Sequence, residues 1–433
     1  MSAPALVPLM NHCRDRAYTN RRKLAESSWT VLLPKAPSKT FTQMALPRIH
    51  VTRPNRIQNP TQPFTHASTS QAHSVLTQGT SMQRQILRAS CALSILATSF
   101  VFVQGQTLSA CRPAPDLRAN TKPGVGGLTF SRDGKTLVVA GGDGKIRFLD
   151  AATGEVQRIL TGHTNVIYKA VFSPDEKLLA SSSRDRTARI WDVASGREVH
   201  KLGGFRCSVK AVTFSPNGKL IAVSGNDGML KLWEVKTGIE LKSLVHINSA
   251  DIDMATYALA FNRDGKKIYG SNGDGTISEW DVESGKENRT WKAPPGGSLG
   301  LVFTPDYRQL ASFSRSTFQL WDIERWRETR TMSTPPPASA TRFSNPIAIS
   351  HKGKLAAGAE IALDKQNNYV YVRTFVWDLH TGKLLWTFEG HRLDVDALVF
   401  TRDDRYLLTG SVDQTIKFWD MKTGQLARTI TLK

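Results

Sequence analysis

His163 and Asp185 are the residues of this sequence whose types best match a catalytic acid–base pair. A histidine oriented by a carboxylate serves as a general base in many hydrolases. The sequence offers little else for that chemistry. It contains no Gly-x-Ser-x-Gly elbow, no glycine-rich phosphate loop and no Cys/His set with metal-ligand spacing. We therefore expect no catalytic residue, no cofactor and no metal.

The pair belongs to a repeat that extends to the C-terminus. The ending Thr187–Asp192, Thr-Ala-Arg-Ile-Trp-Asp, has close copies at steps of 42, 42, 47, 41, 56 and 42 residues. The copies are Leu149–Asp150, Trp233–Glu234, Trp280–Asp281, Trp321–Asp322, Trp377–Asp378 and Trp419–Asp420. A period near 42 residues predicts units that cannot bury a hydrophobic face alone.

Each period reads as four short strands. The first ends before a turn such as Phe172-Ser-Pro-Asp-Glu-Lys, and an Asp-containing turn separates the second strand from the third. Thr-Gly or Ser-Gly then leads into an outer strand, as at Ser195-Gly196. Proline and glycine supply the backbone angles that such turns need. The pattern predicts an all-β domain of seven four-stranded blades over residues 124–433.

The repeat resembles the WD40 family (WD domain, G-beta-like). Gly162-His163 and Gly390-His391 match its Gly-His opening, and Trp-Asp matches its ending. The resemblance implies a seven-bladed β-propeller that acts as an interaction platform. It also implies a buried network of a histidine, a second-strand Ser or Thr, a turn aspartate and a third-strand tryptophan.

Carried onto this sequence, the network falls on particular residues of four blades. Blade two would use His163, Ser181 or Ser183, Asp185 and Trp191, and blade seven His391, Thr409 or Ser411, Asp413 and Trp419. Blades three and four retain Asp227 with Trp233 and Asp274 with Trp280. Blades five and six have Arg315 and Tyr371 at the aspartate position, so we expect both to lack the network. Because an unsatisfied buried polar group costs about 1–3 kcal/mol, we interpret these residues as structural.

The closure of the ring is also predicted. Gln425–Lys433 would form the outer strand of blade seven, whereas Arg112-Pro-Ala-Pro115 is a poor strand because proline cannot donate to a ladder. We therefore expect no N-terminal strand in the last blade, and a monomeric propeller.

Three insertions point to a docking surface. They are Asn248–Asp253, the proline-rich stretch from Thr334 to Pro346, and a longer blade-six hairpin with strands at Ala359–Leu363 and Tyr369–Val372. All of them fall in connections that emerge on one side of a propeller. That side commonly docks proteins in the family the repeat resembles, although neutral loop elaboration would give the same pattern. The candidate partner-binding residues are Arg184, Arg206, Asp251, Asp253, Arg315, Asp364, Asn367, Tyr369 and Arg392.

The net charge of +20 does not favour a nucleic-acid partner. Residues 124–433 hold 42 Lys and Arg against 34 Asp and Glu, so the repeats are only mildly basic. Basic residues are not interleaved with aromatic residues as in a stacking surface. The mixed signs near the insertions favour a polar protein or peptide.

The N-terminal third predicts export. Residues 1–81 are proline-rich, without periodicity, and read as disordered. Met82–Arg88 is basic, Ala89–Val103 is uncharged and mostly apolar, and small residues follow, as in a secretory signal peptide. Residues 82–110 are then a signal peptide or membrane anchor, 111–123 a linker, and Met82 the expected translation start. The alternative is a genuine basic tail that precedes a membrane anchor.

Processing and cysteine chemistry leave alternatives open. Cleavage near Val103–Gly105 competes with Leu108-Ser-Ala-Cys111, which resembles a bacterial lipobox in which Cys111 would be lipidated. Cys111 and Cys207 could pair in an oxidising compartment, or Cys207 could be a buried thiol.

The sequence as a whole favours a non-catalytic scaffold, exported from a bacterial cytoplasm to the periplasm or a membrane and binding a protein or peptide. One alternative is a propeller hydrolase or lyase with its site in the central channel. Another is a cytoplasmic regulatory propeller.

Overall fold

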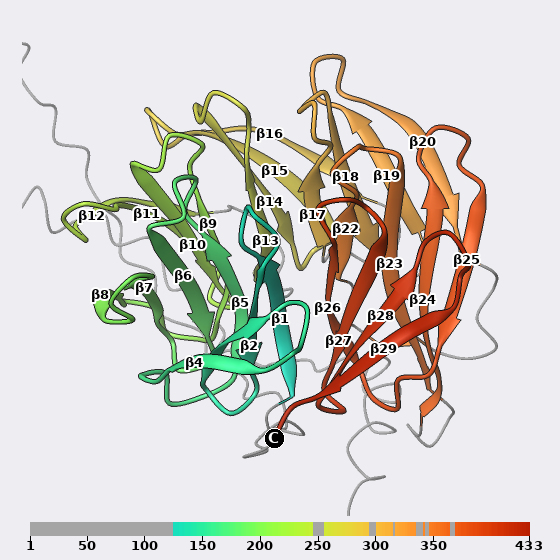
Figure 1. Cartoon of the computed structure of the whole chain (residues 1–433). Helices are drawn as coiled ribbons and strands as arrows, with labels where there is room; N and C mark the ends of the chain where they lie inside the picture. The colour runs from blue at the N-terminus through green and yellow to red at the C-terminus, as the bar shows by residue number, and fades with distance from the viewer. Residues whose placement is uncertain are drawn as a thin grey trace, which may run out of the picture. The chain divides into compact units, whose positions relative to one another are not determined.

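The computed structural model describes residues 124–245, 255–293, 300–314, 317–334, 341–342, 346–363 and 369–433. These residues form seven antiparallel sheets and contain no helix. The sheets are arranged as a seven-bladed β-propeller, as predicted (Figure 1). Residues 1–123, and with them the predicted disordered segment, signal or anchor, linker and Cys111, lie outside the described residues.

Six blades are four-stranded sheets whose strands neighbour one another in chain order. Blades one and two contain β1 (Val125–Phe130), β2 (Thr136–Gly141), β3 (Ile146–Asp150), β4 (Val156–Leu160), β5 (Ile167–Phe172), β6 (Leu178–Ser183), β7 (Ala188–Asp192) and β8 (Glu198–Leu202). Blades three and four contain β9 (Val209–Phe214), β10 (Leu220–Gly225), β11 (Met229–Glu234), β12 (Glu240–Val245), β13 (Thr256–Phe261), β14 (Lys267–Asn272), β15 (Thr276–Asp281) and β16 (Glu287–Lys292). Blade five contains β17 (Gly300–Phe303), β18 (Gln309–Ser314), β19 (Thr317–Asp322) and β20 (Arg327–Ser333). Blade seven contains β26 (Val395–Phe400), β27 (Tyr406–Ser411), β28 (Thr415–Asp420) and β29 (Leu426–Thr431).

Blade six departs from this plan. It contains β21 (Thr341–Arg342), β22 (Ile347–Ile349), β23 (Leu355–Leu363), β24 (Tyr369–Asp378) and β25 (Leu384–Glu389). Both β21 and β22 pair with β23, at different points along its length.

Burial explains why a blade needs its neighbours. The second and third strands are buried on both faces, as in β6 and β7, whereas outer strands such as β8 are mostly exposed. One core between blades one and two contains Val138 and Phe148 of the first and Ile167 and Trp191 of the second. Each core is therefore formed jointly by two neighbouring blades, as in other repeat proteins.

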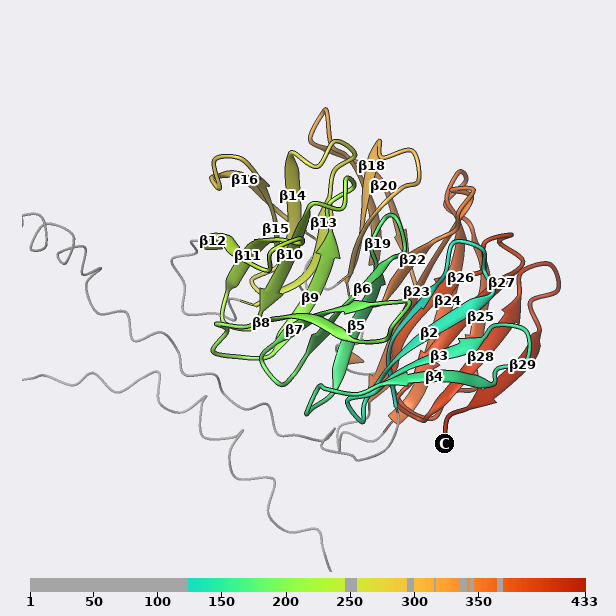
Figure 2. The same cartoon turned by 60° about the vertical axis from the view of Figure 1, so that its left-hand side comes forward.

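The C-terminal strand completes the ring. Blade seven ends with its own β29, which lies at the outer edge of that sheet (Figure 2). β1 packs against β26 and β27. Arg428 of β29 donates from Nη2 to the carbonyl oxygen of Ala151 at 2.8 Å, which joins blade seven to blade one. The prediction that blade seven supplies its own outer strand is therefore confirmed within the described residues.

The first strands of the blades surround the centre (Figure 1). Five of them carry a β-bulge at the same position, where one residue has no partner in the second strand. The bulged residues are Gly126, Tyr168, Lys210, Tyr257 and Asp396. Such a bulge changes the direction of the side chain it carries. The residue type at this position therefore differs from blade to blade while the rest of the strand stays paired.

Candidate functional site

The insertion rim is the side of the propeller on which outer-to-first and second-to-third connections emerge. Turn aspartates fix its loops. Asp185, Asp227 and Asp413 each accept a backbone N–H at Oδ2 from the preceding loop. The donors are Thr164 at 3.2 Å, Arg206 at 2.7 Å and Arg392 at 2.9 Å. The carboxylates thus hold the loops that carry two of the candidate partner-binding arginines.

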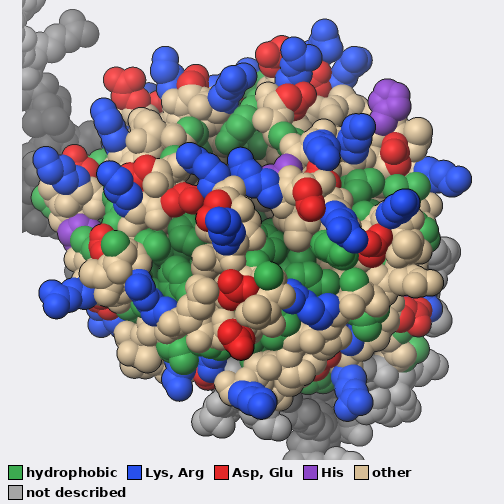
Figure 3. Space-filling view, in the orientation of Figure 1, with side chains coloured by type: hydrophobic (Ala, Val, Ile, Leu, Met, Phe, Trp, Pro, Cys, Tyr) green, Lys and Arg blue, Asp and Glu red, His purple; other side chains and the backbone are tan. Residues whose placement is uncertain are grey.

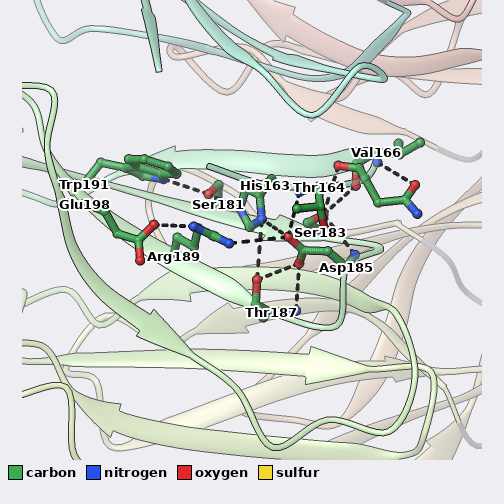
Figure 4. Close-up of polar contacts among 11 residues, drawn as sticks. His163, Thr164, Val166, Ser181, Ser183, Asp185, Thr187, Arg189, Trp191 and Glu198 are labelled. Carbon is green, nitrogen blue, oxygen red and sulfur yellow. Dashed lines mark hydrogen bonds and ion pairs between the residues drawn. The ribbon is translucent and has the colours of Figure 1, made fainter. Parts of the chain in front are cut away.

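Blade two contains a complete polar network (Figure 4). His163 Nδ1 lies 2.7 Å from Asp185 Oδ2, and its Nε2 lies 2.8 Å from Ser181 Oγ. Trp191 Nε1 donates to the same hydroxyl at 2.9 Å. Ser183 has a different role, because its Oγ donates to the carbonyl oxygen of Val166 at 2.9 Å. Of the two serines considered from the sequence, Ser181 is therefore the one in the network.

The network sets the charge of its members. Burial lowers the pKa of His163, which favours the neutral imidazole. Burial alone would raise the pKa of Asp185, but hydrogen bonds from His163 and Thr187 outweigh it and hold that pKa well below its usual range. The His163 side chain is 0% exposed, so a substrate has no access to it. The arrangement joins a loop, a strand and a turn within one blade.

Blade seven repeats the network with a threonine. His391 Nδ1 lies 3.0 Å from Asp413 Oδ2, and its Nε2 lies 2.6 Å from Thr409 Oγ1. Trp419 Nε1 donates to Thr409 Oγ1 at 3.0 Å. The opposing effect of burial on the Asp413 pKa is again outweighed by hydrogen bonds, with His391 the first donor.

Blades three and four replace parts of the network with packing. In blade three, Phe205 lies 5.8 Å from the ring of Trp233, so an aromatic contact stands in for the histidine. In blade four, Trp280 packs on Gly270, where an added Cβ would lie 2.9 Å from the indole. Asp274 there accepts a hydrogen bond from Thr276 Oγ1 at 2.6 Å.

Blades one, five and six differ further. Asp143 of blade one is bound through both oxygens by Arg147, at 3.0 and 2.7 Å. Blade five keeps one bond of the network, because Trp321 Nε1 donates to Ser312 Oγ at 3.0 Å. The expectation that blade five lacks the network is therefore right only in part. In blade six, Tyr371 donates to Glu360 Oε1 at 3.3 Å.

The blade-six hairpin is part of the packed sheet. Ala359 and Ile361 are each 1% exposed, and Ala362 is fully buried. β21 pairs with this extension through Thr341 with Ala362 and Arg342 with Ile361, so two of the three insertions join one sheet. The sequence predicts the hairpin strands correctly but not β21. The buried Glu360 also accepts a hydrogen bond from Thr334 Oγ1 at 3.1 Å.

The predicted partner-binding residues are only partly described. Arg206 and Arg392 are exposed, and Arg184 is half-buried. Tyr369 begins β24. The remaining candidates, Asp251, Asp253, Arg315, Asp364 and Asn367, lie outside the described residues. On the face in Figure 3, basic and acidic side chains are interspersed.

A tryptophan cluster lies on the side opposite the insertion rim. Trp291, Trp321 and Trp326 line a cavity of about 150 Å³ between blades four and five. Trp326 has a φ of 55° at a turn position where the other six blades have glycine. The Arg289 guanidinium lies 4.5 Å from its ring centroid, and the ring of Trp291 lies 5.1 Å away. These contacts stabilise a backbone conformation that is unusual for a bulky residue.

The described residues contain no helix that is long and apolar enough to cross a membrane. They also contain no group of three or more His, Cys, Asp or Glu side chains placed to hold a metal ion.

Comparison with known proteins supports the repeat assignment. Residues 112–150, 154–192, 196–234 and 382–420 match the model described as WD40: WD domain, G-beta repeat. The described residues form a ring of seven blades, six of them four-stranded, and blades two and seven contain the His–Asp–Trp network. The chain contains WD40 repeats folded into a seven-bladed β-propeller.

Several curated proteins are similar to short parts of the chain. WD repeat-containing protein 18 of Mus musculus is 42% identical over 60 residues, which are 14% of this chain and 13% of that protein. THO complex subunit 6 of Arabidopsis thaliana is 32% identical over 75 residues, or 16% of this chain and 20% of that protein. GID complex subunit 7 of Schizosaccharomyces pombe is 29% identical over 79 residues, or 16% of each. The chain thus spans a fifth or less of each relative, and all three relatives are eukaryotic.

Proposed function

We propose that this protein is a non-catalytic interaction scaffold that binds a protein or peptide on its insertion rim. The observation that carries the proposal is the blade-six projection, the part of β23 and β24 that is longer than in the other blades and that pairs with β21. Its Ala359, Ile361 and Val372 pack in a core with Val395 and Leu398 of blade seven. A neutral loop elaboration would not need a packed interior. Val370 near the end of this projection is 51% exposed, which leaves an apolar contact on its surface.

The relatives favour the same reading. Two of them are named as complex subunits, THO complex subunit 6 and GID complex subunit 7. The arginines Arg206 and Arg392 are exposed on loops that Asp227 and Asp413 hold in place. A rim with cationic side chains on anchored loops and an apolar projection suits a polar peptide or protein surface.

Affinity capture tests the proposal. Replacing Ala359–Val372 as a whole would remove buried core residues, so the variant should shorten only the turn at residues 364–368 to Asn-Gly, a favoured two-residue hairpin turn. We expect bound proteins to be lost while the melting temperature is kept. If the shortened variant captures the same proteins as the natural chain, the partner binds elsewhere on the protein.

We also propose that the protein is exported from a bacterial cytoplasm and reaches the periplasm or a membrane. The support is the order of basic, apolar and small residues in 82–110, together with Cys207, which is disulfide-bonded. N-terminal peptide mapping should find Met82 as the translated start and a processed end before the propeller. A lipid on Cys111 would indicate lipobox processing, and an intact N-terminus at Met1 would contradict the proposal.

A further inference from the structure

Lys169 occupies a position that is Gly or Ala in five of the other six blades and Pro346 in blade six. It stands three residues before Phe172, and the corresponding residues in five other blades are Gly127, Ala211, Ala258, Gly300 and Ala397. The three alanines are at most 5% exposed. Small residues are needed because the first strands approach closely, and a Cβ on Gly127 would lie 3.1 Å from Lys169 Cα. The long, cationic side chain of Lys169 is therefore unusual at this position.

The side chain of Lys169 faces the boundary between blades two and three. Lys169 pairs with Ser182, and the next residues on that face, Val171 and Ala180, pack in the core shared with blade three. Lys169 is nevertheless partly exposed. Because β5 is the innermost strand of its blade, the solvent that reaches it is that of the central channel.

A second lysine lies at the same boundary. Ser182 Oγ donates to the carbonyl oxygen of Lys210 at 3.2 Å, so one serine neighbours both lysines. Lys210 is the bulged residue of β9, and its Nζ lies 3.7 Å from the ring centroid of Tyr168. The aromatic face holds this ammonium in place without neutralising it. Lys169 and Lys210 form what we call the channel lysine pair.

The channel lysine pair has no counter-charge among the described residues. Neither lysine makes an ion pair there, and burial lowers the pKa of Lys169. Two cations that are buried in the propeller have partners: Lys231 lies 2.9 Å from Glu240, and Arg147 lies 2.7 Å from Asp143. A half-buried cation without a partner is unfavourable, and an incoming anion would reduce that penalty.

We propose that the channel lysine pair binds a carboxylate of an acidic peptide segment that enters the channel from the insertion rim. This inference rests on the proposed function, because β5 and β9 begin on that rim and both lysines lie in the first half of their strands. The carboxylate accepts charge-assisted hydrogen bonds from both ammonium groups, and the Tyr168 ring orients Lys210. The arrangement selects for an acidic residue at one point of the partner.

Calorimetric titration of the full chain with acetylated tetraglutamate amide tests the inference, with tetraglutamine and inorganic phosphate as separate arms. We expect one tetraglutamate site per chain, and affinity at least tenfold weaker in Lys169→Met and in Lys210→Met, which is the scale of one lost ionic contact. Lys177→Met and Lys219→Met are matched controls, since both lysines are exposed in the same two blades on the opposite side. The controls should bind like the natural chain.

Three outcomes would overturn the inference: equal binding of tetraglutamine, affinity unchanged in both lysine variants, or binding of phosphate alone. The last would make the pair a site for free inorganic anions. Acetylation kinetics of Lys169, followed by mass spectrometry, should also slow when tetraglutamate is present. If tetraglutamate binds as expected but the shortened blade-six turn leaves capture unchanged, the proposed function fails and the anion site stands. If tetraglutamate does not bind but the shortened blade-six turn abolishes capture, the anion site fails and the proposed function stands.

Discussion

His163 and Asp185 are joined by a 2.7 Å contact between Nδ1 and Oδ2, and the same carboxylate oxygen accepts the amide of Thr164. Asp227, the corresponding residue of blade three, accepts the amide of Arg206 but has Phe205 in the histidine position. The two aspartates therefore share a backbone role, and Asp185 alone adds a buried link to a histidine. This difference separates the loop-fixing role of the carboxylate from its role in the network.

Asp185→Ala should destabilise the protein more than Asp227→Ala. Removing Asp185 leaves a buried histidine nitrogen without its partner, which costs about 2–3 kcal/mol, whereas loss of the amide contacts alone costs about 1 kcal/mol. Urea unfolding of both variants measures the difference. Equal losses would show that the histidine link contributes nothing to stability.

Stability should fall with pH below about 6.5 because of His163. Its pKa in the folded state lies below the ordinary value of 6.5, so the unfolded chain takes up a proton first as the pH drops. Stability is therefore fully present above 6.5 and decreases as the pH falls toward the folded-state pKa, by up to about 1.4 kcal/mol per pH unit.

Urea unfolding at several pH values between 8 and 5 measures this slope. His163→Gln should be less stable at pH 8 and should show a shallower slope than the natural chain, since the titrating ring is gone. Parallel slopes for the two proteins would refute the assignment to His163.

Gly144→Ala should cost more than Gly134→Ala, although both glycines belong to blade one and have similar positive φ values of 79° and 71°. A Cβ on Gly144 would lie 2.8 Å from the carbonyl oxygen of His163, whereas a Cβ on Gly134 would meet only Arg402 Cβ at 4.0 Å. The shared left-handed backbone costs about 1–2 kcal/mol in each. The clash should add about 1–3 kcal/mol to the first. Thermal unfolding of the two variants compares them directly, and equal melting temperatures would contradict the close approach of blades one and two.

Deleting residues 427–433 should make the protein aggregate. The deletion removes most of β29 with the buried Ile430, and also the buried Leu432 that follows this strand, and it leaves β28 with an unpaired edge. Size-exclusion chromatography with light scattering should detect larger species, while deletion of Lys433 alone should leave a monomer. A monomeric truncated protein with unchanged melting would show that β29 does not close the ring.

Much of this fold could be predicted from the sequence because the repeat carries its own signals. The Trp-Asp endings at a near-constant period give seven blades, and the position of Gln425–Lys433 after the last ending gives the closing strand. β21 could not be found in this way, since Thr341 and Arg342 lie in a proline-rich stretch too short to show alternation. It forms because the extended β23 offers an edge for pairing.

The lysines of the channel escaped sequence analysis for a different reason. Along the chain, Lys169 is one basic residue in a strand, and nothing in its immediate neighbours is unusual. Its significance depends on knowing that the first strands form the innermost ring and that Ser182 brings Lys210 to the same boundary. Alignment of the seven repeats at this position would have shown the Gly and Ala residues from which Lys169 departs.

Docking of partners on the insertion rim can be measured as the dissociation constant of a captured partner. Surface plasmon resonance should compare the natural chain with Arg206→Glu/Arg392→Glu, and with the matched pair Lys177→Glu/Lys219→Glu on the opposite side. We predict that the rim variant binds at least tenfold more weakly and the control binds normally. Unchanged affinity in the rim variant, or an equal loss in both variants, would show that the partner does not dock on the insertion rim.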